Sequence, residues 1–168
     1  MKTLIFILVV LVLGVGQEKI DLDGLSEKIS SQIESNLPGW KYKRIPPFGT
    51  RETKVIVQQW YTTNKSVMVQ IAVRATAEDA KKEIRSFLEF RREPQELIAF
   101  GDEAYVPEPN VPSVVLRRGR YVIYINPGEA VESESEVLSP EGQERRRVER
   151  ERLGKEFAKL LSTIELPA

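Results

Sequence analysis

The sequence contains neither cysteine nor histidine among its 168 residues. Without cysteine the chain can form no disulfide, offers no thiolate nucleophile and lacks a lipid-modified N-terminal cysteine. Without histidine it can form neither a Ser-His-Asp triad nor an imidazole zinc site. A glycine-rich phosphate loop and the nucleophile elbow of hydrolases are also missing from the sequence. We therefore expect no catalytic residue, no metal site and no cofactor, and carboxylate-only catalysis is the remaining enzymatic alternative.

The charge of the chain is balanced, with 25 basic and 25 acidic residues. A balanced charge provides no bulk field to attract nucleic acid or an anionic membrane. Lys41, Lys43 and Arg44 alternate with Trp40 and Tyr42, a pattern typical of a stacking and phosphate-binding surface. The alternative is an edge strand whose charges prevent aggregation. We favour the edge strand and expect no nucleic-acid partner.

The N-terminus carries the features of a secretory signal peptide. Lys2 precedes an apolar run over residues 4–13, and small residues follow at Gly14 and Gly16. We expect cleavage after Gly16 and export to the periplasm or the medium. The alternative is a membrane anchor, but the run is well short of the ~20 residues that span a bilayer. Membrane contact is therefore expected only through an uncleaved signal segment.

Residues 17–168 are expected to form one domain organised around residues 54–90. Residues 54–61 and 67–73 read as two strands of a hairpin, joined by a loop of about five residues. Thr76 can then cap a helix over residues 77–88, because its hydroxyl can accept from the amide of Asp79. The apolar stripe of this helix can pack on the hairpin.

The remaining segments complete an α+β pattern. We expect a helix over residues 17–37, capped by Asp21 or Asp23, and a closing helix over residues 144–164. Short strands are expected near residues 40–45 and 104–106, followed by a hairpin of 113–117 and 120–125 that turns at Arg118-Gly119. Residues 126–143 read as a mobile acidic loop. The prediction is a mainly antiparallel sheet of about five strands with packed helices.

Two charged clusters are candidate binding sites. Arg117, Arg118 and Arg120 crowd the expected hairpin tip, where they could hold a carboxylate or phosphate. The alternatives are a solvated tip, or pairing with the acidic loop that follows. Asp102 and Glu103 precede a strand, and adjacent strand residues point to opposite faces, so we expect a structural role in the turn rather than convergence on one substrate.

Two further patterns are weighed as sites. The glutamates of residues 129–136 lack the ligand spacing and turn glycine of a calcium loop, which favours a solvated loop. Five aromatic residues could line a pocket, but aromatic residues at strand spacing are typical of a core. These are Trp60, Tyr61, Tyr105, Tyr121 and Tyr124.

The run Gly101-Asp102-Glu103-Ala104-Tyr105, together with the later Arg117-Arg118-Gly119-Arg120 strand pair, is similar to a pattern in uncharacterised exported bacterial proteins. The resemblance covers roughly residues 55–164 and brings no assigned chemistry. The order of elements also resembles the α/β/α sandwich of the PsbP/Mog1-like fold, which cannot supply a function.

We expect a non-enzymatic binding or accessory module of the bacterial envelope. Its partner would be a protein or a small molecule, held by the residues Asp102, Tyr105, Arg117, Arg118 and Arg120. The alternatives are a hydrolase-like enzyme that uses Asp102 or Glu103, and a structural envelope component. The sequence leaves the identity of the partner and the oligomeric state open.

Overall fold

The structure is a computed structural model and describes residues 21–49, 54–97, 99–108, 111, 113–129 and 139–167. Its strands are β1 (Lys41–Gly49), β2 (Lys54–Tyr61), β3 (Lys65–Val73), β4 (Gln95–Glu96), β5 (Glu103–Val106), β6 (Val114–Arg118) and β7 (Tyr121–Glu129). Its helices are α1 (Leu22–Asn36), α2 (Ala77–Glu89) and α4 (Pro140–Thr163). The strands form one antiparallel sheet in the order β1-β2-β3-β7-β6-β5-β4. The expected α+β class with a mainly antiparallel sheet is confirmed.

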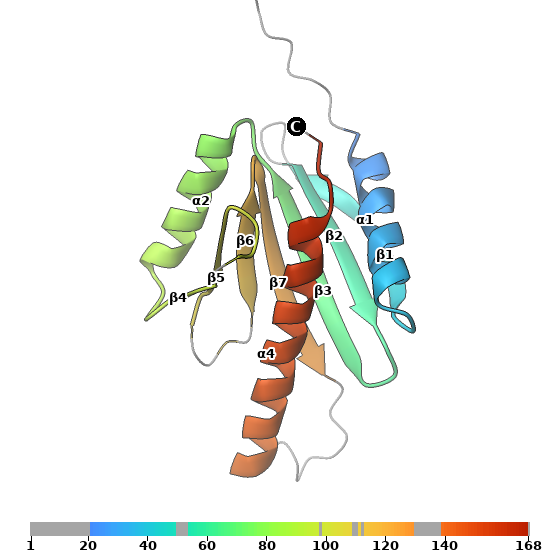
Figure 1. Cartoon of the computed structure of the whole chain (residues 1–168), viewed down its shortest axis with the longest axis vertical. Coiled ribbons are helices and arrows are strands. Elements are labelled where there is room, and N and C mark those ends of the chain that lie inside the picture. The colour runs from blue at the N-terminus through green and yellow to red at the C-terminus, as the bar shows by residue number, and fades with distance from the viewer. Residues whose placement is uncertain are drawn as a thin grey trace, which may run out of the picture.

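The helices are distributed unequally over the two faces of the sheet. The helices α1 and α4 lie on one face, α1 over β1 and β2 and α4 over β6 and β7 (Figure 1). On the opposite face α2 packs on β6 and β7. Among the described residues no helix packs on β1 and β2 from the α2 side, and on that side of β2 Gln59 and Tyr61 are exposed while Val57 is buried.

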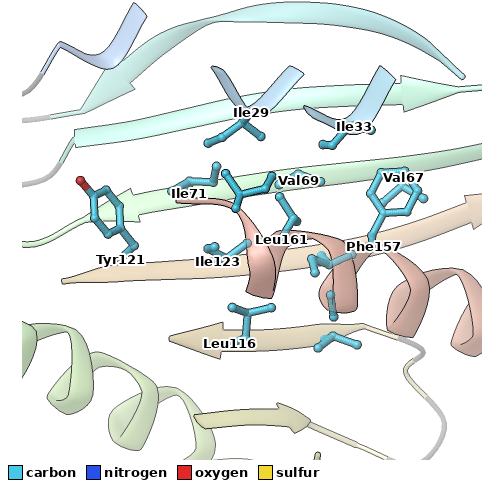
Figure 2. Close-up of a cluster of buried hydrophobic side chains, with 14 of the residues drawn as sticks. Ile29, Ile33, Val67, Val69, Ile71, Leu116, Tyr121, Ile123, Phe157 and Leu161 are labelled. Atoms are coloured by element: carbon cyan, nitrogen blue, oxygen red, sulfur yellow. The ribbon is translucent and has the colours of Figure 1, made fainter. Parts of the chain in front are cut away.

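Strand alternation explains where the main core lies. Val67, Val69, Ile71 and Val73 of β3 share one face and are buried, as predicted from their spacing. Figure 2 shows Val67, Val69 and Ile71 beside α1, represented by Ile29 and Ile33, and α4, represented by Phe157 and Leu161. Each such fully buried side chain contributes about 1.5–3 kcal/mol relative to exposure. This core lies on the face of the sheet opposite to α2.

The helix starts follow capping chemistry. Asp21 caps α1, its carboxylate accepting from the amides of Asp23 and Gly24 at 3.1 Å each. Thr76 caps α2 by accepting from the amide of Asp79 at 3.1 Å, as predicted. Buried Gln58 joins α1 to β2, donating to the Ser26 carbonyl at 2.9 Å. These contacts fix the helices at defined places on the sheet.

The sheet has seven strands, so the expected count of about five is wrong. The two-residue strand β4, which pairs with β5, was not predicted, because two residues are too few for a periodic signal. The predicted hairpin loop of five residues is shorter, because β3 begins at Lys65 and the Thr62 amide donates to the Lys65 carbonyl at 2.8 Å. The hairpin itself is confirmed.

The region interpreted as an acidic loop is partly regular structure. The strand β7 continues to Glu129, because β3 still supplies partners: Val67 faces Pro127 and Lys65 faces Glu129. Proline is tolerated there because β6 pairs with β7 only up to Ile125, which leaves the other side of the strand without a ladder. The closing helix begins at Pro140, four residues earlier than expected. Its cap is Ser139, whose hydroxyl accepts from the Gly142 amide at 3.0 Å.

The β6–β7 turn lies one residue later than predicted. Arg118 pairs with Tyr121, so Gly119 and Arg120 are the two turn residues. Gly119 has a φ of 54°, and glycine at the first turn position is what a type II′ hairpin requires. The expected Arg118-Gly119 turn would have placed an arginine in that left-handed conformation.

Three predictions lie outside the described residues in whole or in part. These are the signal peptide of residues 1–16, the first four residues of the helix expected over residues 17–37 and, within the acidic loop, residues 130–138. Among the described helices none has the length and the apolar character needed to cross a membrane.

Candidate functional site

The predicted site around Asp102 and Arg117 is a set of intramolecular contacts. The Arg117 Nε donates to Glu103 Oε1 at 2.5 Å, and its Nη1 donates to Asp102 Oδ2 at 2.8 Å. Asp102 Oδ2 also accepts from the Gly119 amide at 2.7 Å. We call Asp102, Glu103, Arg117 and Gly119 the turn cluster. It ties the start of β5 to the tip of the β6–β7 hairpin.

The convergence of the two carboxylates on one guanidinium corrects an expectation. Asp102 and Glu103 were expected to point apart, as adjacent residues of a strand do. Asp102 instead lies just before β5, where Gly101 turns the chain with a φ of 65°. A Cβ at Gly101 would lie 2.6 Å from the Arg117 carbonyl oxygen, so glycine is also required by the close approach of the two backbones.

The three arginines of the predicted tip have different surroundings. Arg117 and Arg118 are adjacent on β6 and so point to opposite faces. Arg118 donates to the carbonyl oxygen of Ile164, just after α4, where a cation is favourable. The Arg120 guanidinium lies 5.9 Å from the centre of the Tyr121 ring, and its Nε is buried without a hydrogen-bond partner. Of the three arginines, Arg120 alone has a guanidinium that makes no hydrogen bond or ion pair with a described residue.

Tyr105, the fifth predicted binding residue, is half-buried beside the turn cluster. Its hydroxyl donates to Glu103 at 3.5 Å. Burial, followed by the nearby charge of Glu103, raises the pKa of Tyr105 above its ordinary value. The structure therefore brings Asp102, Tyr105 and Arg117 together and separates Arg118 from them.

The alternating run at residues 40–44 is split by the pleat of β1. Tyr42 stacks on Trp60 at 5.0 Å, and Trp40 meets Phe157 edge-on at 5.0 Å, so both rings are used by the main core. Lys41 and Lys43 are exposed on the other face of this edge strand. The aromatic and basic residues therefore do not form a common stacking surface, and the edge-strand interpretation is confirmed.

An open groove lies on the α2 side of the sheet, with a volume of about 360 Å³. Its floor comes from β3 and β7, and one wall comes from the C-terminal part of α2 and the segment after it. The other wall includes Pro107, Glu108, Val111 and Ser113, from the stretch between β5 and β6. The lining residues are Gln70, Phe87, Arg91, Pro107, Glu108, Val111, Ser113, Tyr124 and Asn126. None of the turn-cluster residues is among them.

The floor of the groove is fixed by a half-buried network. The Tyr124 hydroxyl donates to Glu83 at 2.8 Å, and Glu83 also accepts from the Arg74 guanidinium. Burial, followed by the Glu83 hydrogen bond, raises the pKa of Tyr124 far above its ordinary value. Tyr124 therefore stays a neutral donor, and its hydroxyl is used by α2 rather than offered to a ligand.

The guanidinium of Arg91 contacts residues of both walls of the groove. The Arg91 guanidinium donates to Glu108 at 2.9 Å and lies 4.7 Å from the centre of the Phe87 ring. Phe87 in turn meets Tyr124 edge-on at 5.3 Å. The two charged residues of the lining neutralise one another, so the groove has no net charge.

Three uncharged polar side chains of the lining are available to a ligand. Ser113 and Asn126 make no side-chain hydrogen bond with any described residue, and Gln70 makes only a long contact of 3.7 Å with the Met68 sulfur. Together they offer two amides and a hydroxyl, which both donate and accept. Among the described residues, no cluster of acidic, cysteine or histidine side chains could hold a metal ion.

Sequence reasoning missed the groove, although two of its signals were visible. Phe87 was assigned to the helix stripe, and Tyr124 was noted only as one of five aromatic residues. Trp60 and Tyr121 of that set are core, with 0% and 2% exposure. The second wall comes from the stretch between β5 and β6, of which Pro107, Glu108, Val111 and Ser113 line the groove. A long irregular segment beside a sheet was the available signal.

The comparisons with known proteins give no family and no relative. No protein-family model, no curated protein and no solved structure matches this chain. The resemblance to uncharacterised exported bacterial proteins and to the PsbP/Mog1-like fold therefore stays a prediction.

Proposed function

We propose that the chain is an exported, non-enzymatic binding or accessory module of the bacterial envelope that holds its ligand in the groove beside α2. The observation that carries this proposal is the contrast in side-chain availability. The carboxylates suggested for catalysis, Asp102 and Glu103, are hydrogen-bonded inside the turn cluster. In the groove, by comparison, the side chains of Ser113 and Asn126 have no hydrogen-bond partner in the described part of the chain, and Gln70 makes only a long contact with Met68.

The chemistry of the groove favours binding over catalysis. General acid-base catalysis requires a titratable group within reach of the substrate. The titratable acid and base of the lining, Glu108 and Arg91, are paired with each other, and the Tyr124 hydroxyl is held by Glu83. Neutral amides, a hydroxyl and aromatic edges remain, and these are groups that orient a bound molecule.

The alternative of a structural envelope component has less support. It predicts a large exposed apolar patch. The large apolar side chains that are exposed in the described residues are Tyr61, Phe90, Val111 and Val148, and they belong to four different segments. Scattered apolar residues of this kind are normal on a surface.

Blocking the groove tests the proposal. The full chain, expressed in a bacterial envelope and isolated from it, is examined by native mass spectrometry for co-purifying molecules. Asn126→Trp places a large side chain at the groove in a strand that tolerates aromatic residues. Gln32→Trp, at an exposed position of α1 on the other side of the sheet, is the matched control.

We expect the wild type and Gln32→Trp to retain a ligand that Asn126→Trp loses. Retention of the same ligand by Asn126→Trp, or absence of any ligand from the wild type, would contradict a binding role for the groove. Turnover of a bound molecule that stops in Glu103→Gln would instead support the hydrolase-like alternative.

A further inference from the structure

From the groove, a row of side chains that are polar except for Met68 crosses the half of the sheet on which no described helix packs. Strand registers place Lys43 beside Gln59, Gln59 beside Met68, and Met68 beside Asn126 of the groove. We call these four residues the polar row. It crosses β1, β2, β3 and β7 at right angles to the strands.

All four side chains point to the same face of the sheet, away from α1 and α4. Their neighbours along the strands, represented by Tyr42, Trp60, Val67 and Ile125, pack into the main core, and successive strand residues alternate between faces. Lys43, Gln59 and Asn126 are exposed and Met68 is half-buried.

The geometry points to a linear, uncharged saccharide as the ligand of the groove and the polar row together. This inference rests on the proposed function and names the class of ligand. Neighbouring strands are about 4.8 Å apart, so the row spans about 14 Å from Asn126 in the groove to Lys43 on β1, which is the reach of a short oligosaccharide rather than of one sugar ring.

The side chains match hydroxyl groups better than charged or backbone groups. The amides of Gln59, Gln70 and Asn126 present donors and acceptors side by side, as neighbouring hydroxyls do. Tyr61 lies two residues along β2 from Gln59, on the same face of the sheet, and is 38% exposed. Its ring can pack on the apolar face of a sugar.

A peptide is the less suitable occupant of this surface. Peptides bind sheets mainly by pairing their backbone with an edge strand. A sheet face offers side chains only, because its backbone groups are used in the ladders. The groove has no net charge for an ionic ligand, since Arg91 and Glu108 are paired, and the single charge of the polar row, Lys43, lies at its far end on the edge strand β1.

Calorimetric titration with sugars of different length tests the inference. The probes are cellohexaose, chitohexaose and maltohexaose, each compared with its monosaccharide, and amide shifts in NMR spectra locate the site. We expect at least one hexamer to bind more tightly than its monosaccharide, with shifts along β1, β2, β3 and β7. Binding should be nearly independent of salt, because no ion pair forms.

Two variants separate the groove from the polar row. Gln59→Ala should weaken hexamer binding about fivefold to tenfold and leave monosaccharide binding unchanged, because one hydrogen bond to a distant sugar is lost. Asn126→Ala should weaken both by a similar factor. Gln32→Ala on α1 is the matched control and should change neither.

Three outcomes would overturn the inference: no binding of any hexamer at millimolar concentration, equal binding of monosaccharide and hexamer, or shifts confined to Arg117–Arg120. Binding of a proline-rich peptide in the groove would also overturn the inference of a saccharide ligand. The binding function of the groove would stand in that case. Absence of any ligand from the wild type in the blocking experiment above would count against both proposals.

Discussion

The turn cluster and the groove lie at opposite ends of the β6–β7 hairpin and use polar residues in opposite ways. In the turn cluster the side chains of Asp102, Glu103 and Arg117 are bonded to one another and to Gly119. In the groove, Ser113 and Asn126 contact no described polar partner. The charged residues that are conspicuous in the sequence stabilise the fold, and uncharged residues of little prominence are left for a ligand.

The largest effect on stability is expected from a substitution at the centre of the turn cluster. Arg117→Ala should lower the free energy of unfolding by about 3 kcal/mol, because it leaves the half-buried carboxylate of Glu103 without its cation. Urea unfolding at neutral pH measures this loss. Arg85→Ala, at an exposed position of α2, is the control and should change stability by less than about 0.5 kcal/mol.

A second substitution tests whether that loss of stability comes from the unpaired charge of Glu103. Glu103→Gln added to Arg117→Ala should restore about 1 kcal/mol, because it removes the uncompensated charge. Ligand binding in the groove should be unchanged in both variants. A loss below about 1 kcal/mol for Arg117→Ala, or a change in ligand affinity, would remove the distinction between the two regions.

Local signals made much of the fold predictable. The alternation of β3, the Asp21 and Thr76 caps and the apolar stripes of the helices depend on residues close in sequence, and they are confirmed. The errors lie where the bounds of a strand depend on pairing with a neighbouring strand. The strand β4 forms only because it pairs with β5, and β7 extends past Pro127 only because β3 continues beside it. The turn at Gly119 was misplaced by one residue because its position depends on the β6–β7 register.

The candidate site was less predictable for the same reason. Arg117 meets Glu103 because β5 and β6 pair in a register that no local pattern specifies. The groove joins Gln70, Phe87, Ser113 and Asn126 from four separate segments. None of these residues is unusual in its own surroundings, so their convergence could be seen only in the folded chain.

The next largest effect on stability is expected from a substitution in the floor of the groove. Tyr124→Phe should destabilise the protein by about 1–2 kcal/mol, because Glu83 loses one of its two donors. Ligand affinity should change little, since the hydroxyl already serves α2. Thermal and urea unfolding measure the loss. Tyr61→Phe, at an exposed position, is the matched control and should be neutral; equal losses in the two variants would contradict the role of the Glu83 bond.

An exposed ion pair provides a weaker version of the chemistry in the turn cluster. Hydrogen bonds from Arg152 and then Lys65 lower the pKa of Glu149 from 4.5 to about 2. A lowered folded-state pKa stabilises the protein above the unfolded-state value and loses that effect as the pH falls towards 2. Glu149→Gln should therefore cost about 0.5–1 kcal/mol at pH 7, a size typical of partly exposed pairs.

The difference between Glu149→Gln and the wild type should shrink between pH 4.5 and pH 2, and urea midpoints across this range measure it. Glu34→Gln, at an exposed position of α1 that has no ion pair with a described residue, is the control and should show no such convergence. A constant difference across the range would mean that Glu149 stabilises α4 by something other than its charge.

The smallest effect on stability is expected in the groove itself. Asn126→Ala should change the free energy of unfolding by less than about 0.5 kcal/mol, because the side chain is exposed and has no described hydrogen-bond partner. Asp102→Ala is the informative comparison, since it also removes a short polar side chain but breaks bonds to Arg117 and Gly119. Urea unfolding of the two variants side by side should show a loss only for Asp102→Ala. A loss of more than about 1 kcal/mol for Asn126→Ala would mean that this residue supports the fold, and the argument that the groove side chains are reserved for a ligand would fail.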